Sequence, residues 1–295
     1  MKILILGATG TVGHQLAEEI AQGAPQIQLR LTSRRDDGVT QLEQEFPDAE
    51  ICKTDYLDPA SLESAIRGVT KIMVVNPDSI DENRACANLV EAIGLAGGVT
   101  HVLRLLTYPP GLTPADIKPE ARAIPIGFNQ GITARQALDS SDIPLTYVNV
   151  VSSFMTNLLW SADLIRTRQK FVMPCPQTQT WLDPADIAQV CARILMDDPD
   201  LHSGKTYVLS GVELISYDDI ADMLTRELGI SIEYSDDEAL LKEMFGHEYE
   251  LSTNYFEFER DYYANVQATD VVERFLGRQP YPMRQWIHEN AGRFR

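Results

Sequence analysis

A run of glycines near the start of the chain has the residue types and the spacing that bind a dinucleotide. Gly7, Gly10 and Gly13 stand in the order G-x-x-G-x-x-G, between an apolar stretch and a segment with helical spacing. In such a loop one glycine permits a tight turn, another lets the backbone approach a pyrophosphate, and the last allows the helix to pack closely on the sheet. The amino terminus of the helix then offers free N–H groups to phosphate. We therefore predict cofactor contacts at Gly7, Thr9, Gly10, Thr11, Val12 and Gly13.

The segment that ends the second predicted strand selects the form of the dinucleotide. Enzymes that use NAD usually place Asp or Glu about 20 residues beyond the glycine loop, where it binds the ribose 2′-hydroxyl. This chain has Ser33, Arg34 and Arg35 there. Guanidinium groups hold a 2′-phosphate by charge-assisted hydrogen bonds, each contributing about 1.5–3 kcal/mol. The sequence therefore predicts NADP(H) as the cofactor. The alternative is that both arginines are solvated charges paired with Asp36 and Asp37.

Residues at the ends of two later strands are candidates for the reacting end of the cofactor. In an open α/β sheet the carboxyl ends of the strands face the ligand crevice. Asn76 and Pro77 follow the fourth predicted strand, and Thr107 and Tyr108 follow the fifth, so we expect all four beside the cofactor. We predict Tyr108 as a proton donor and Lys118 as a contact to the nicotinamide ribose or to an anionic substrate. A surface tyrosine and a solvated lysine are the alternatives.

Three further residues are predicted to contact a substrate. Asn129 stands near the start of the helix before the sixth strand, where it is either a hydrogen-bond donor to a carbonyl or a helix N-cap. Phe154 and Asn157 open the second half of the chain and are expected beside a cleft, with core packing as the alternative for Phe154. Five of the residues in 254–263 are Tyr or Phe. This run indicates a small apolar or aromatic substrate or, equally, core packing or a subunit interface.

These residues need a scaffold in which strands and helices alternate. Buried apolar strands are predicted at residues 2–6, 27–32, near 51, 71–75, 101–106 and 145–150, with helical patterns between them. Alternation of this kind gives a parallel sheet covered on both faces. We therefore predict an α/β fold, with a Rossmann-type doubly wound parallel sheet over residues 1–151 and residues 183–200 packing back on it. Residues 152–295 are predicted to form a smaller, mostly helical, substrate-binding lobe, with a helix over 154–165 and a proline-rich loop over 171–176.

The composition excludes several classes of partner. The chain has 295 residues, of which 44% are apolar, and this content favours a packed core. Its formal net charge of −18 repels nucleic acid and anionic membranes. Its four cysteines form no Cys-x-x-Cys pair and have no histidine at ligand spacing, so no metal is predicted. We find neither a cleavable apolar leader nor an apolar run of about 18 residues, and we expect a cytoplasmic protein without a membrane partner.

Five segments together resemble the NmrA-like branch of the atypical short-chain dehydrogenases/reductases. They are the glycine loop and residues 55–62, 181–188, 204–207 and 216–221. The resemblance covers nearly the whole chain and implies a Rossmann core, a small C-terminal lobe, a substrate cleft between them, and a place for Asp55 near the adenine. The family includes NADPH-dependent reductases of quinones and of other small unsaturated or carbonyl compounds. It also includes redox-sensing regulators that bind the dinucleotide without chemistry. Because the superfamily often forms dimers, a homodimer remains open.

The chain departs from the superfamily where catalysis is concerned. Classical members use a Tyr-x-x-x-Lys pair for proton donation, and none of the 11 tyrosines here has a lysine four residues later. The segment at the sixth strand, often Leu-Arg-Pro in the family, is Val148-Asn149-Val150. We predict an NADPH-dependent reductase of a small carbonyl, enone or quinone compound. The alternatives are a non-catalytic NADP(H)-sensing regulator and a non-redox isomerase, dehydratase or cyclase on the same scaffold.

Overall fold

The computed structural model describes residues 1–125 and 127–295, which divide into two compact units. Unit 1 consists of Met1–Tyr108, Pro125–Val150 and Ile187–Val208, and unit 2 consists of Pro109–Ile124, Val151–Asp186 and Leu209–Arg295. The boundary predicted at residue 151 is one of the points where the chain passes from unit 1 to unit 2. Two segments depart from a division at that point alone: residues 109–124 belong to unit 2, and residues 187–208 belong to unit 1.

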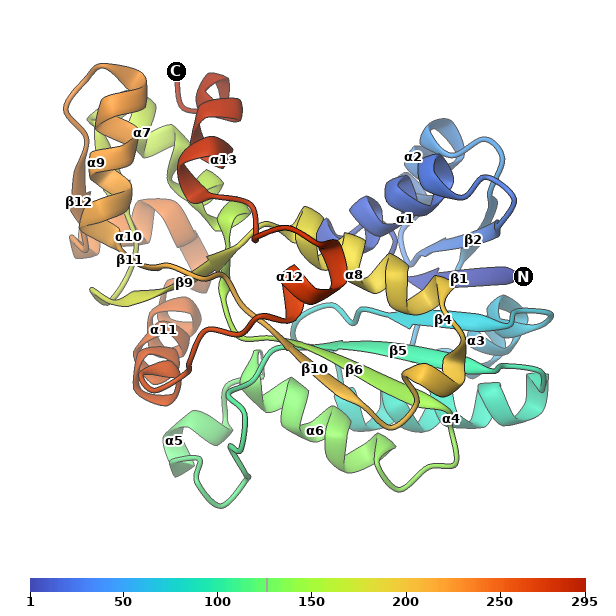
Figure 1. Ribbon diagram of the computed structural model, residues 1–295. Coiled ribbons are helices and arrows are strands. Elements are labelled where there is room, and N and C mark those ends of the chain that lie inside the picture. Colours follow the sequence, from blue (N-terminus) through green and yellow to red (C-terminus); the bar gives the residue numbers. More distant parts are fainter. Residues whose placement is uncertain (126) are drawn as a thin grey trace. The chain divides into compact units, whose positions relative to one another are not determined.

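Unit 1 is built on a parallel sheet whose seven described strands follow the order β10-β6-β5-β4-β1-β2-β3 (Figure 1). They are β1 (Lys2–Leu6), β2 (Gln28–Ser33), β3 (Glu50–Lys53), β4 (Lys71–Val74), β5 (His101–Leu106), β6 (Leu145–Val150) and β10 (Thr206–Leu209). The order changes direction between β1 and β4, which pair from Ile3↔Lys71 to Leu6↔Val74. Doubly wound sheets bind ligands at this change of direction. The predicted α/β, doubly wound fold is confirmed.

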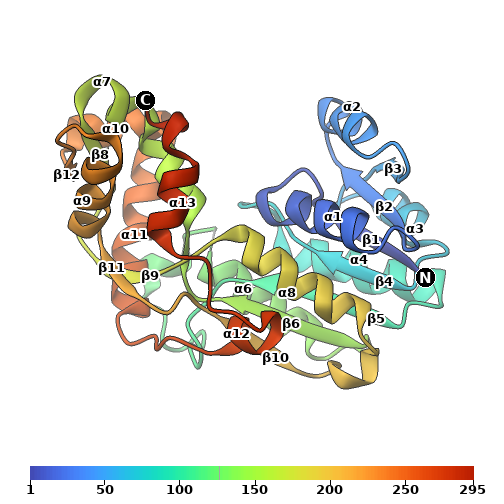
Figure 2. The same cartoon turned by 45° about the horizontal axis from the view of Figure 1, so that its top comes forward.

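Helices cover both faces of this sheet, which explains why its central strand β1 is apolar along nearly its whole length. On one face lie α1 (Thr11–Gly23), α2 (Asp36–Glu45) and α8 (Pro184–Met196), and on the other lie α3 (Pro59–Ile66), α4 (Glu82–Ala96) and α6 (Phe128–Leu138) (Figures 1 and 2). Strand β1 shows the consequence, since Ile3, Leu4 and Ile5 are completely buried. A strand buried on both faces has no polar side to alternate with its apolar side.

Two helices are capped by side chains that adjoin them in the sequence. The side chain of Asp58 accepts hydrogen bonds from the N–H groups of Ala60 and Ser61, and Pro59 occupies the first helical position of α3. Ser216 and Asp219 form a capping box at the start of α9 (Tyr217–Leu228). Such caps satisfy N–H groups that the first helical turn leaves unpaired.

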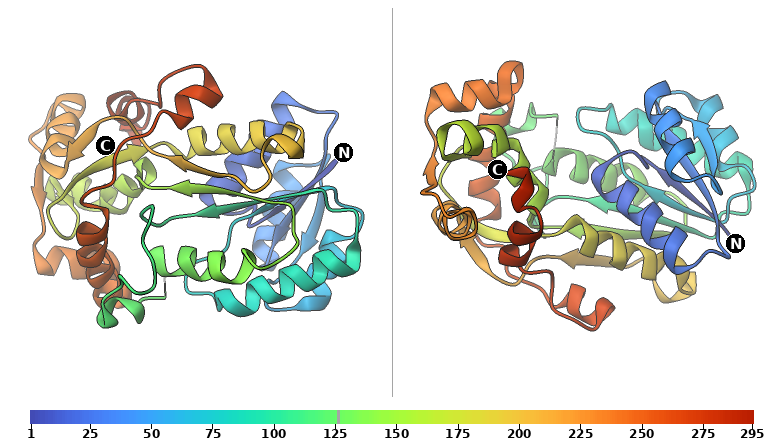
Figure 3. Two further views of the ribbon diagram at one scale, coloured as in Figure 1. Left: turned by 60° about the horizontal axis from the view of Figure 1, so that its bottom comes forward. Right: turned by 90° about the horizontal axis from the view of Figure 1, so that it is seen from above.

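Unit 2 combines helices with two small sheets in its described residues. One sheet has the order β11-β9-β7, and the other pairs β12 with β8. These strands are β7 (Ser153–Phe154), β8 (Lys170–Val172), β9 (Thr178–Leu182), β11 (Leu214–Ser216) and β12 (Glu233–Ser235). The α-helices besides α9 are α5 (Pro119–Arg122), α7 (Ala162–Arg168), α10 (Glu238–Phe245), α11 (Tyr249–Tyr263), α12 (Val271–Leu276) and α13 (Met283–Glu289). Helices α9 and α13 lie side by side (Figure 3).

Two predicted elements of unit 2 differ in part from the structure. The helix predicted from Phe154 begins later, because Phe154 pairs with Leu182 in the parallel β7–β9 ladder; a 3-10 helix (Met155–Ser161) and α7 follow. The predicted loop over 171–176 contains β8, in which Phe171 pairs with Tyr234 of β12. Both errors concern short strands whose partners are distant in the sequence, and aromatic residues fit such strands once the partner is present.

Candidate functional site

The glycine loop has the geometry that its spacing predicts. Gly7 has φ +87°, and a Cβ atom there would lie 2.4 Å from the carbonyl oxygen of Val75. A Cβ atom on Gly13 would lie 2.2 Å from the carbonyl oxygen of Gly7. Both distances are shorter than van der Waals contact, so the packing of α1 against β1 and β4 requires glycine at both positions. Gly10 is different: the nearest atom to its Cβ position is the Gly7 oxygen at 3.3 Å, so its other side is open to a ligand.

The amino terminus of α1 is left uncapped beside this loop. Gly10 is the N-cap residue, no side chain caps the helix, and the first turn has no acidic residue. The first N–H groups of a helix have no acceptor within it. The turn formed by Thr11, Val12 and Gly13 therefore presents backbone donors and the positive end of the helix dipole to an anion.

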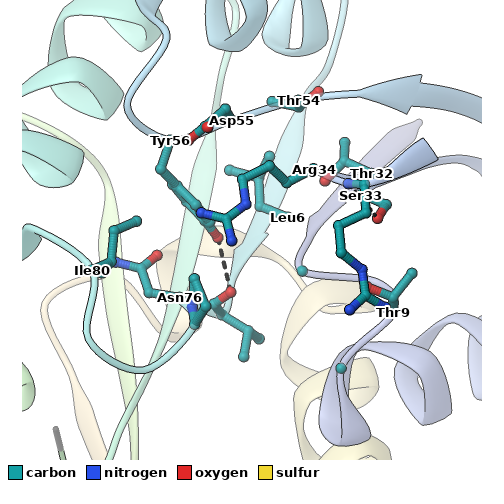
Figure 4. A pocket seen from close by; sticks show the side chains of 15 residues that line it. Leu6, Thr9, Thr32, Ser33, Arg34, Thr54, Asp55, Tyr56, Asn76 and Ile80 are labelled. Atoms are coloured by element: carbon teal, nitrogen blue, oxygen red, sulfur yellow. Dashed lines mark hydrogen bonds between the residues drawn. The ribbon is translucent and has the colours of Figure 1, made fainter. Parts of the chain in front are cut away.

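A pocket lies next to the loop, where β1, β2, β3 and β4 end (Figure 4). It brings together most of the residues predicted to contact a cofactor. Its lining consists of Leu6, Gly7, Thr9, Gly10, Thr32, Ser33, Arg34, Arg35, Thr54, Asp55, Tyr56, Val75, Asn76, Pro77 and Ile80. The predicted Thr11, Val12, Gly13 and Thr107 are not part of the lining, although the first three stand in the adjacent turn of α1.

The two arginines of the pocket have different surroundings. The Nε atom of Arg35 lies 3.1 Å from a carboxylate oxygen of Asp37, and both side chains are exposed. Asp36 instead pairs with Lys53 at 2.7 Å. Among the described residues Arg34 has neither an ion pair nor a hydrogen bond to its side chain, and it extends over the pocket in the direction of Tyr56 (Figure 4). The alternative that the arginines are solvated charges paired with acidic neighbours therefore holds for Arg35. It does not hold for Arg34, whose guanidinium is available to an anion.

One wall of the pocket comes from the predicted Asp55 together with Tyr56 and Val75, which were not predicted from the sequence. The hydroxyl of Tyr56 donates to the carbonyl oxygen of Val75 at 3.0 Å, which joins the segment after β3 to the end of β4. Burial raises the pKa of the Tyr56 phenol, so the group remains neutral. The carboxylate of Asp55 accepts the N–H of Leu57 at 2.9 Å and forms a tight turn at the pocket edge. Tyr56 belongs to the segment 55–62 that resembles the NmrA-like family, but only the fold shows that its side chain forms a wall of the pocket.

A buried ion pair lies behind the wall of the pocket and was also missed. Arg104 in β5 and Glu82 in α4 are 2.7 Å apart, and their side chains are 5% and 4% exposed. The amide nitrogen of Asn76 donates to both carboxylate oxygens of Glu82, at 2.8 and 2.9 Å. This network ties the end of β4 to the strand and helix beside it. A charged residue inside an apolar parallel strand was the available signal, because a buried charge needs a partner.

Tyr108 is held from two sides just beyond β5. Its N–H donates to Oδ1 of Asn149 at 3.0 Å, and its carbonyl oxygen accepts from Nδ2 of Asn149 at 2.9 Å. Its ring lies against Gly131 of α6, where a Cβ atom would be 2.9 Å from the ring atom Cδ1. The side chain of Gln130 donates to the carbonyl oxygen of Pro77 at 3.1 Å. The first turns of α6 therefore contact the ends of both β4 and β5.

Lys118 lies in unit 2 and has partners there. Its Nζ atom is 3.0 Å from a carboxylate oxygen of Asp261, and its N–H donates to the hydroxyl of Tyr262 at 2.7 Å. The hydrogen bond that Lys118 donates to the Asp261 carboxylate raises the pKa of Lys118. These contacts attach the segment around Lys118 to α11. Its contact to the nicotinamide ribose or to an anionic substrate stays a prediction.

The residues predicted to contact a substrate occupy different elements. Asn129 lies within the first turn of α6, whose N-cap is Gly127, so the N-cap alternative for Asn129 is wrong. Phe154 ends β7, and Asn157 lies in the 3-10 helix that follows; both are partly exposed. A substrate role for all three stays a prediction.

Two other kinds of site are absent from the described part of the chain. It has no group of three or more His, Cys, Asp or Glu side chains arranged to hold a metal ion. None of its helices combines the length and the apolarity that crossing a membrane requires.

Comparison with known proteins places this geometry in context. The chain matches the NmrA-like family over residues 1–283. It is 27% identical to a (4-alkanoyl-5-oxo-2,5-dihydrofuran-3-yl)methyl phosphate reductase of Streptomyces griseus, with 99% of each chain covered. It is 28% identical to an NAD(P)H azoreductase of Xenophilus azovorans, covering 79% of this chain and 76% of that one. The solved NADPH complex of an Escherichia coli NADPH-dependent quinone oxidoreductase shares its fold with a TM-score of 0.77 and 21% identity, covering 98% of this chain and 99% of that one.

Proposed function

This chain belongs to the NmrA-like family, and we propose that it is an NADPH-dependent reductase of a small carbonyl, enone or quinone compound. The observation that carries the proposal is the unpaired Arg34 in a pocket that ends at the glycine loop. A guanidinium without a protein partner next to an uncapped helix terminus fits a ligand with two separate anionic groups. A dinucleotide with a 2′-phosphate and a pyrophosphate is such a ligand.

The residues of the pocket suit the adenosine, the 2′-phosphate and the pyrophosphate of NADPH. Gly10 and the first turn of α1 would hold the pyrophosphate, and Ser33 with Arg34 would hold the 2′-phosphate. Asp55 and the wall formed by Tyr56 would enclose the adenosine. When bound, the cofactor supplies a hydride to the substrate. The similarity to reductases whose names specify NAD(P)H or NADPH supports this assignment.

The chain itself must supply orientation and a proton. Reduction of a carbonyl or quinone oxygen requires a proton as the hydride arrives at carbon. We assign the proton to Tyr108, which follows β5 at the carboxyl edge of the sheet and is held by Asn149. Replacing Tyr108 with Phe is expected to lower kcat about 100-fold, within the range that general acid catalysis contributes.

The names of the relatives support a proposal for the class of substrate. Their names specify a dihydrofuranone phosphate, an azo compound and a quinone. We propose for this chain a small conjugated acceptor with an apolar or aromatic body. Phe154 and the partly exposed aromatic residues of α11 are the candidates in unit 2 for contact with that body, whereas Phe256 is buried in the core.

The proposal is tested first by calorimetric titration with NADPH and NADH. Binding of NADPH at least about tenfold tighter than NADH is expected, because only NADPH offers a 2′-phosphate to Arg34. NADPH oxidation is then followed with menadione, an azo dye and a simple enone as acceptors. The cofactor assignment is wrong if neither nucleotide binds.

A second candidate function is a sensor that binds NADP(H) and does no chemistry. The missing Tyr-x-x-x-Lys pair favours it. Tight NADPH binding without oxidation by any of the three acceptors is the result that would replace the reductase with the sensor.

A further inference from the structure

The ladder between β5 and β6 continues past its last backbone pair through a side chain. Its paired residues run from Val102↔Leu145 to Leu106↔Asn149. Beyond them, the side-chain amide of Asn149 accepts the N–H of Tyr108 through Oδ1 and donates to the carbonyl oxygen of Tyr108 through Nδ2, at 3.0 and 2.9 Å. These two bonds occupy the backbone donor and acceptor of Tyr108, which in a continued parallel ladder would bind two different residues of β6. We call this arrangement the Asn149 clamp.

The chemistry of the clamp requires an amide. Asn149 is 1% exposed, so each of its polar atoms needs a partner inside the protein. A carboxylate of the same size could accept from the N–H of Tyr108 but could not donate to its carbonyl oxygen. An apolar side chain would leave both backbone groups of Tyr108 unpaired. Asn149 is therefore fitted to the backbone of Tyr108, and it stands in the segment where this chain departs from its family.

The clamp fixes more than the backbone. With its backbone held by β6, Tyr108 lays its ring on α6 at Gly131, where the absence of a Cβ atom leaves the space that the ring occupies. The neighbouring Gln130 binds the carbonyl oxygen of Pro77, which lines the cofactor pocket. The hydroxyl of Tyr108 has no hydrogen-bond partner among the described residues. The structure thus holds Tyr108 firmly at every group except its phenol oxygen.

We propose that Asn149 is a positioning residue that holds the Tyr108 phenol in the orientation for proton transfer to the substrate, an inference that rests on the proposed reductase function. The substrate carbon gains a hydride from NADPH, which becomes NADP⁺. The substrate oxygen gains the phenol proton, and the phenolate regains a proton from solvent. Without a lysine four residues after the tyrosine, orientation is the means that remains for making this acid effective.

The test compares N149D, N149S and Y108F in steady-state reduction of menadione by NADPH. We expect kcat to fall about 10-fold or more in both Asn149 variants, with the KM for menadione and the Kd for NADPH within about twofold of the unmodified protein. The double variant N149D/Y108F should be no slower than Y108F, because the clamp acts only through Tyr108. A merely structural role would lower stability without this kinetic pattern.

A matched control lies in the same strand. Thr146 is completely buried and its hydroxyl bonds His101 and the carbonyl oxygen of His202, so T146V removes buried hydrogen bonds at the other end of β6. It should lower the unfolding temperature and leave kcat unchanged. G131A provides a second route, since it displaces the Tyr108 ring while the clamp stays intact; it should lower kcat as the Asn149 variants do, even if N149D fails to fold.

The outcomes separate this inference from the function on which it rests. If the unmodified protein binds NADPH but reduces none of the three acceptors, the reductase function is wrong and the positioning role fails with it. If it reduces menadione and Y108F is slow, while N149S and G131A keep kcat within twofold, the clamp alone is wrong. A double variant slowed by the product of the two single effects also overturns it, because Asn149 would then act independently of Tyr108.

Discussion

Polar residues lie at both ends of the strands in unit 1, but they differ in whether they have protein partners. We call the side where the strands end the carboxyl edge and the side where they begin the amino edge. At the carboxyl edge Arg34, the first turn of α1 and the Tyr108 phenol lack protein partners in the described structure. At the amino edge Lys71 donates to the carbonyl oxygens of Leu195 and Asp197 at 2.8 and 2.6 Å. The polar groups named at one edge are left available to a ligand, and those of the other bind within the fold.

The histidines of the amino edge show how completely that edge is internally bonded. His101 is 2.9 Å from the hydroxyl of Thr146, and His202 bonds Tyr207 at 2.8 Å and Asp197 at 3.2 Å. Only Nδ1 of His101 lacks a partner among the described atoms of this cluster. A group of histidine, lysine and aspartate is therefore no sign of a site by itself. Its partners, and the edge on which it lies, decide between chemistry and packing.

The largest predicted effect tests whether the buried ion pair behind the pocket stabilises the fold at the carboxyl edge. E82L removes the partner of Arg104 and should lower the free energy of unfolding by about 3–5 kcal/mol, because an uncompensated charge remains buried. Urea unfolding measures this loss. The double variant E82L/R104M should recover much of it, since both charges are then gone. A single variant as stable as the unmodified protein would show that the pair is not buried in solution.

The sequence predicted what depends on neighbours along the chain. The glycine loop and the pair Arg34-Arg35 are local patterns whose spacing carries their chemistry, and the pocket contains both arginines. The cap at Asp58 is equally local. These features were predictable because one segment alone determines them.

The rest of the site arises from contacts between distant segments. Arg104 meets Glu82 from another element, Tyr56 closes the pocket through Val75, and Asn149 holds Tyr108 from the neighbouring strand. No local spacing encodes such pairs. The same cause explains the error at Phe154, whose strand exists only because β9 lies beside it.

The second largest predicted effect is a loss of stability in acid that arises from His101 at the amino edge. Burial, and then the charge of Lys71, lowers the pKa of His101 from 6.5 to about 4. Between pH 6.5 and 4 the His101 imidazole is therefore protonated in the unfolded chain but neutral in the folded chain. Protonation of the unfolded chain lowers the free energy of unfolding, so the stability present above pH 6.5 is lost as the pH falls towards 4. The loss amounts to about 3 kcal/mol.

Comparison of H101Q with the unmodified protein separates the contribution of His101 to the acid loss of stability from that of the carboxylates, which also titrate. Urea unfolding at several pH values between 4 and 7 should show a shallower acid loss for H101Q than for the unmodified protein. NADPH affinity at neutral pH should be the same in both. Equal acid losses would mean that His101 takes up its proton in the folded state, against the burial seen here.

The third effect is at the carboxyl edge and should appear in binding alone. R34S removes the unpaired guanidinium, so the affinity for NADPH should fall about 10- to 100-fold while the affinity for NADH stays unchanged. Because Arg34 has no protein partner, the unfolding temperature should not change. R35S is the matched control, and its smaller loss should reflect the pairing of Arg35 with Asp37. A fall in stability with R34S would break the distinction between the two edges.

The smallest effect comes from relieving the one pocket arginine that has a partner. Asp37 is exposed, pairs with Arg35, and places a negative charge near the predicted 2′-phosphate site. D37N frees Arg35 and removes that repulsion, so NADPH affinity should rise about two- to fivefold, in keeping with the weak energy of an exposed ion pair. The gain should shrink as salt is added, because the charges are solvent-screened. A gain equal for NADH and NADPH would place Asp37 away from the 2′-phosphate and would leave Arg34 as the sole determinant of cofactor choice.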